Sequence, residues 1–124
     1  MESFSHQNEI LSFASADSLE EGFTKKFLES YWRRRTDLKI PSRGIVPKTP
    51  RAVSIFTPEK NIKELRHIKL LPRELKTFNN EIDIYGDNVA IISLVKSQEH
   101  AVIIRSKTIA QSLRSLFEAF WQML

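Results

Sequence analysis

The feature that most constrains the fold is a pair of apolar-rich runs, residues 81–85 and 89–95, on either side of a Gly-Asp-Asn turn at 86–88. In the first run, Ile82 and Ile84 alternate with polar residues, and such alternation predicts a half-buried strand. A short turn that contains Gly and Asp between two such runs predicts a β-hairpin. The second run is almost entirely apolar, so we expect it to be the more buried strand.

The chain continues into a third strand, AVIIR at residues 101–105, which extends the hairpin to a meander. An apolar helix then begins near Thr108, whose hydroxyl forms a capping box with Gln111. The apolar stripe expected on this helix consists of Ile109, Leu113, Leu116, Phe117, Phe120, Trp121 and Leu124. Such a stripe commonly covers an adjacent sheet, and the alternative is that it binds a partner helix.

The N-terminal part predicts alternating strands and helices. Phe23, Phe27 and Tyr31 recur at four-residue spacing, which is typical of an amphipathic helix. Thr57 and Pro58 fit the N-cap and the first turn of a shorter helix. The expected elements are a strand at 10–13, a helix at 19–35, a strand at 40–46 followed by a loop, a helix at 58–67 and a strand at 68–70. This order predicts an α/β fold.

Composition favours one intracellular domain. A chain of 124 residues, 41% of them hydrophobic, can bury one core of ordinary size. Cysteine is absent, which excludes disulfides and thiolate metal sites and suits a reducing cytosol. No apolar run approaches the roughly 20 residues of a membrane helix, and the three histidines lack the spacing of a helical zinc site. We therefore expect a cytoplasmic protein that uses no metal, no cofactor and no membrane.

Positive charge gathers in one segment of a chain whose net charge is +4. The basic residues of this segment are Arg33, Arg34, Arg35, Lys39, Arg43, Lys48 and Arg51, and only Asp37 opposes them. Such a patch can hold a phosphate or a nucleic-acid backbone. The alternative interpretation is a set of solvated side chains that gather at a helix C-terminus, where the helix dipole favours them.

Five motifs, in their order along the chain, carry a family resemblance. They are YWRRR, IPSRGIVP, LRHIKLLP, EIDIYGDNVAIISL and AVIIRSKTIAQSLRSLFEAFW, the last with Phe117 four residues before Trp121. The set resembles the C-terminal effector domain of TrmB-like transcriptional regulators and spans nearly the whole chain. The resemblance implies a mixed sheet packed by helices, similar to the phospholipase D fold. It also implies that residues 1–124 form a single, partial effector-type domain, truncated at its N-terminus.

The resemblance raises the question of catalysis, because phospholipase D enzymes carry the signature His-x-Lys-x4-Asp. That chemistry needs an imidazole nucleophile and a cation that holds the phosphate. When Asp87 is aligned with the signature acid, the His and Lys positions fall on Asn80 and Ile82. Residues 77–95 contain neither His nor Lys in any register. We therefore expect no catalytic residues and no enzyme activity.

The resemblance implies an effector-sensing or dimerisation domain that lacks its winged-helix DNA-binding part and meets DNA only indirectly. A missing neighbour would expose a strand edge, and such edges pair with other chains. The expected partners are thus a second copy of this chain or a winged-helix subunit, together with a small-molecule effector such as a sugar.

Candidate effector contacts are Arg35, Arg43 and Arg66, which could hold an anionic group through charge-assisted hydrogen bonds, and Trp32, which could stack on a sugar ring. The alternative is that the three arginines form surface ion pairs with Glu29, Asp37 and Glu64, and that both tryptophans serve in packing. A second functional hypothesis is non-specific nucleic-acid binding by the basic segment 33–51, through Arg33, Arg34, Arg35, Lys48 and Arg51.

Overall fold

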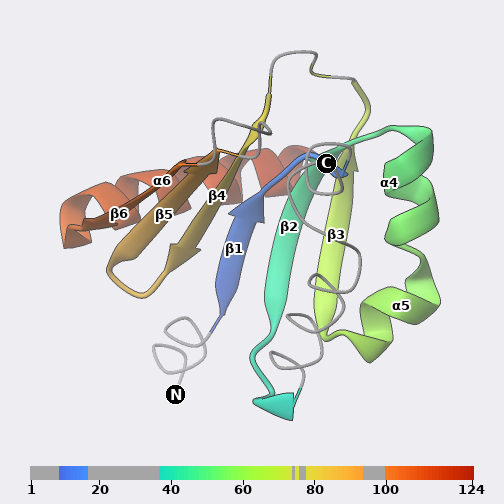
Figure 1. The fold of residues 1–124 in the computed structure, drawn as a ribbon, viewed down its shortest axis with the longest axis horizontal. Helices are drawn as coiled ribbons and strands as arrows, with labels where there is room; N and C mark the ends of the chain where they lie inside the picture. The colour runs from blue at the N-terminus through green and yellow to red at the C-terminus, as the bar shows by residue number, and fades with distance from the viewer. Residues whose placement is uncertain (1–8, 17–36, 74, 76–77, 94–99) are drawn as a thin grey trace.

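The computed structural model describes residues 9–16, 37–73, 75, 78–93 and 100–124. These residues form one six-stranded sheet in the order β3-β2-β1-β4-β5-β6 (Figure 1). The strands are β1 (Ile10–Phe13), β2 (Ser42–Pro47), β3 (Arg66–Leu71), β4 (Asn80–Tyr85), β5 (Asn88–Ser93) and β6 (His100–Arg105). The helices of the described residues are α4 (Pro50–Ile55), α5 (Pro58–Lys63) and α6 (Lys107–Met123).

The sheet is mixed, as the sequence predicts. Strands β1, β2 and β3 are parallel to one another, whereas β4, β5 and β6 form an antiparallel meander. The two halves join where β1 pairs antiparallel with β4. Because parallel neighbours need a crossover, the helices α4 and α5 lie between β2 and β3 in the sequence. The α/β fold class is confirmed.

The predicted hairpin is present with its turn at Gly86 and Asp87. Gly86 has a φ of 57°, a left-handed conformation that glycine adopts without the steric cost of a Cβ atom. The carbonyl of Asp87 accepts a hydrogen bond from the backbone N–H of Ser106, which follows β6. The turn therefore also fixes the point at which the chain leaves the sheet for α6.

Helix α4 was not expected, because the sequence around Pro50 favours a loop. Thr49 caps the helix by accepting from the N–H of Ala52, and Pro50 lies in the first turn, where its missing donor costs nothing. The short helix predicted at 58–67 has the expected Thr57 cap but ends at Lys63. Threonine N-caps therefore set the starts of α4 and α5, and the proline in the first turn of each helix does not interrupt it.

The start of α6 also differs from the prediction. Ser106, not Thr108, is the N-cap, and its hydroxyl accepts from the N–H of Ile109. Leu65, with a φ of 54°, ends the turn after α5 and leads directly into β3. The helix predicted at 19–35 lies outside the described residues.

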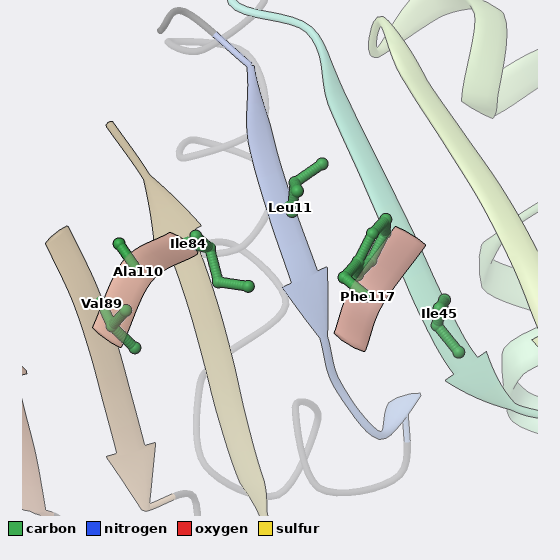
Figure 2. Close-up of a cluster of buried hydrophobic side chains, with 6 residues drawn as sticks. All are labelled: Leu11, Ile45, Ile84, Val89, Ala110 and Phe117. Atoms are coloured by element: carbon green, nitrogen blue, oxygen red, sulfur yellow. The ribbon is translucent and has the colours of Figure 1, made fainter. Parts of the chain in front are cut away.

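The main core lies between the sheet and α6. Four strands each contribute one buried side chain to it, and α6 contributes Ala110 and Phe117 (Figure 2). The strand residues are Leu11, Ile45, Ile84 and Val89. In Figure 2, Phe117 lies between Leu11 and Ile45, and Ala110 lies near Ile84 and Val89. A single helix thus bridges both the parallel and the antiparallel halves of the sheet.

A smaller core lies on the opposite face, under α4. Ala52 packs with Val46 and Ala16, and the partly buried Ile68 and Leu70 of β3 adjoin them. Successive residues of a strand point to opposite faces, so Val46 and its neighbour Ile45 serve different cores. Helices α4 and α6 therefore cover the two faces of the sheet.

Replacement of Phe117 by Ala should destabilise the protein by about 3–5 kcal/mol, because it leaves a cavity between α6 and the strands β1 and β2. Ile62 on α5 is 79% exposed and lies outside the core, so Ile62→Ala is a control that should cost little. Urea unfolding followed by circular dichroism measures both. Similar losses in the two variants would contradict the assignment of Phe117 to the core.

Candidate functional site

Arg43, a predicted effector contact, is held by two carboxylates. Its Nε donates to Oε2 of Glu9 at 2.9 Å, and Nη2 donates to Oε2 of Glu118 at 2.7 Å. Nη1 donates to the other oxygen of Glu118 at 2.9 Å, which makes that pair bidentate. The guanidinium therefore ties β2 to the residue before β1 and to α6, rather than pairing with the nearby Asp37.

Aromatic rings complete the environment of Arg43. The guanidinium lies 5.4 Å from the centroid of Phe117 and 5.2 Å from that of Trp121. The hydrogen bonds with Glu118 raise the pKa of Arg43, and the contacts with Glu9 raise it further. Burial lowers this pKa, but the two carboxylates outweigh it. The guanidinium of Arg43 thus links β2 to α6.

Arg66, a second predicted contact, serves the other face of the sheet. Its Nε donates to Oδ1 of Asn61 at 2.8 Å, and its Nη2 donates to the carbonyl of Ile55 at 3.0 Å. Its guanidinium lies 4.7 Å from the centroid of Phe56, and the residue is only 7% exposed. Because Arg43 contacts α6 and Arg66 contacts the end of α4, the structure does not bring the two together.

The remaining predicted site residues divide between described and undescribed parts of the chain. Lys48 and Arg51 are exposed, as the nucleic-acid hypothesis requires. Arg33, Arg34, Arg35 and Trp32 lie outside the described residues. Effector binding and nucleic-acid binding by these side chains remain predictions.

Trp121 serves in packing, as expected. Its ring stacks on Phe117 at a centroid distance of 5.6 Å, and His67 meets its edge at 5.4 Å. Lys69 lies 4.5 Å from the ring centroid and donates to the Trp121 carbonyl at 2.8 Å. The contacts of Trp121 anchor the C-terminal turns of α6 on β3.

Sequence reasoning missed a cluster of polar residues on the face opposite α6. The hydroxyl of Ser12 donates to Oδ1 of Asp83 at 2.6 Å, directly across the β1–β4 pair. Burial raises the pKa of Glu81 well above its ordinary value, and the charge of Asp83 and the hydrogen bond with it raise it further. Two acidic residues at alternate positions of one strand were the sequence signal, since they share one face.

Sequence reasoning also misjudged the stripe of α6, which divides into two faces. Leu113, Phe117 and Trp121 pack against the sheet core. The outward face instead exposes Ile109 (42%), Leu116 (54%), Phe120 (46%) and Met123 (80%), and Leu124 (38%) follows the helix. The apolar arc is therefore wider than one sheet can cover.

The charged residues of α6 all lie away from this outward face. Arg114 donates to the carbonyl of Gly86 at 2.8 Å, and Glu118 accepts from Arg43. At about 100° per residue, Lys107 falls between these two, so all three charges lie within a sector of roughly 40°. The outward face, which we call the α6 outer face and define as Ile109, Ser112, Leu116, Ala119, Phe120 and Met123, carries no charge.

The described residues hold neither a cluster of three metal-ligating side chains nor a helix long and apolar enough to span a membrane. No protein-family model matches the chain, and no curated protein matches it. The α6 outer face is an exposed apolar surface, and water-exposed apolar patches mark interaction sites.

A double-mutant cycle tests the link between Arg43 and Glu118. Arg43→Met and Glu118→Gln should each destabilise the protein, and the cycle should show a coupling of about 1 kcal/mol, because Arg43 is partly shielded from solvent. Lys48→Met, at an exposed position just after β2, is the control for the loss of a positive charge. A coupling of zero would show that the ion pair adds nothing beyond packing.

Glu81 should make the protein less stable as the pH rises. Since the pKa of Glu81 is raised on folding, the unfolded chain releases its proton first, and the folded state loses relative stability above about pH 4.5 until Glu81 also ionises. Glu81→Gln mimics the protonated form, so this variant should gain stability over the original protein at neutral pH but not at pH 4. Urea midpoints across this range measure the difference, with Asp87→Asn on the exposed turn as the control. An unchanged pH profile would contradict the raised pKa.

Proposed function

We propose that this chain is a non-catalytic, cytoplasmic dimerisation domain related to the TrmB-like regulators. The observation that carries the proposal is the uncharged, apolar outer face of α6. This face adjoins the residues of α6 that pack on the sheet, and exposed apolar surface of this kind marks interaction sites. Burial of this face requires a partner, because the sheet already occupies the other side.

The contacts of Arg43 and Arg66 support dimerisation over effector sensing. Arg43 spends its three donor groups on Glu9 and Glu118, and Arg66 is buried against the ends of α4 and α5. An effector that used both residues would need to reach both faces of the sheet. Any effector site would therefore depend on other residues.

The hairpin supports a non-catalytic role. It carries no His and no Lys between residues 77 and 95, and the two acidic side chains of β4 contact neighbouring side chains of the sheet. Asp83 accepts from Ser12, and Glu81 is favoured in its protonated form. These contacts stabilise the junction of β1 and β4, which supports a structural role for the hairpin.

Sedimentation velocity over a broad range of protein concentrations tests the proposed function. We expect a reversible increase in sedimentation coefficient with concentration, toward the value of a dimer. A parallel thermal-shift screen with sugars and sugar phosphates tests the effector-sensing alternative, since a ligand that binds only the folded state raises the melting temperature. A protein that stays monomeric at the highest attainable concentration would contradict dimerisation.

A further inference from the structure

The α6 outer face has a size pattern that suggests its partner. Leu116 lies at its centre, and Ile109 and Met123 lie seven residues to either side, on nearly the same line of the helix. Four residues before Leu116 is the small Ser112, and four residues after it is the large Phe120. The N-terminal half of the face therefore has a small side chain at the position where the C-terminal half has a large one.

We propose that the α6 outer face packs against the same face of a second copy of this chain, with the two helices antiparallel and Leu116 on the twofold axis. This inference rests on the proposed dimerisation function and adds the partner surface and the orientation. In this arrangement Leu116 meets Leu116, Ile109 lies level with Met123, and Phe120 lies level with Ser112. Each contact then occurs twice, as a twofold interface requires.

The parallel arrangement is disfavoured by the same pattern. It would place Phe120 level with Phe120 and Ser112 level with Ser112, so one end would be crowded and the other would hold a gap, and both defects cost stability. The antiparallel arrangement also sets the helix dipoles head to tail. Size and electrostatics therefore select the same orientation.

Charge and area favour a second copy over a charged partner. The face carries no charged residue, so it offers an acidic or basic partner no complementary group, whereas it matches itself. Its four large side chains are 42–80% exposed, and at about 150–200 Å² for a fully exposed side chain they amount to roughly 330–440 Å² per copy. Two copies would bury about 700–900 Å², which is the size of a weak, transient interface. The expected dimer is reversible and forms at micromolar or higher concentration.

Charge substitution at Leu116 tests the contact. Leu116→Glu should raise the dissociation constant of the dimer at least tenfold, because two like charges would face each other on the axis. Ile62 on α5 is 79% exposed, so Ile62→Glu is a matched control that should leave the dimer intact. Leu116→Lys should also be monomeric alone, and an equimolar mixture with Leu116→Glu should restore a heterodimer if residue 116 meets itself. Far-ultraviolet circular dichroism verifies that each variant is folded.

Disulfide trapping tests the orientation, and the absence of native cysteine makes it specific. Chains with Ile109→Cys mixed with chains with Met123→Cys should form the mixed disulfide at least severalfold faster than either chain alone. Preferential self-linking of Ile109→Cys would overturn the antiparallel arrangement. A dimer that Leu116→Glu leaves unchanged would overturn the α6 contact but leave the proposed function standing, whereas a monomeric original protein would contradict both.

Discussion

The attachment of α6 to the sheet is the interaction on which the rest of the structure depends. Phe117 fills the space over β1 and β2, and Arg43 binds Glu118 one residue farther along the helix. Phe117 is fully buried in the core, and the ion pair fixes the rotation of the helix about its axis. Because the rotation is fixed, Leu116 must point away from the sheet. The rotation of α6 about its axis therefore determines both which of its residues enter the core and which form the outer face.

The other polar contacts of the domain have the same character. Lys69 donates to the last turns of α6, Arg114 to the hairpin turn, and Arg66 to the helices between β2 and β3. Lys69 and Arg114 join elements that are distant in sequence, whereas Arg66 joins β3 to the two helices just before it. Long polar side chains thus connect elements at the periphery of the two apolar cores. The function proposed for this domain is therefore inferred from an apolar surface, the α6 outer face.

The sequence predicted the parts of the structure that depend on local chemistry. The alternation in β4, the glycine at the turn and the Thr57 cap are local, and all three were confirmed. Helix α4 was missed because Pro50 was taken as a breaker when it starts the helix. The partners of Arg43 could not be predicted, since Glu118 is 75 residues away and only the fold brings the two together. The division of the α6 stripe depends on which side meets the sheet, which the helical period alone does not determine.

The central position of β1 has a consequence for how the chain folds. Leu11 must meet Ile84 on β4 and Phe117 on α6, so β1 cannot settle until segments far along the sequence have formed. The meander β4-β5-β6 and α6 are contiguous in sequence, and contacts between near neighbours close with the smallest loss of chain entropy. We expect this C-terminal unit to assemble first and to present an open edge at β4. The first strand of the sheet in sequence would then join among the last, as the piece that connects two separately formed halves.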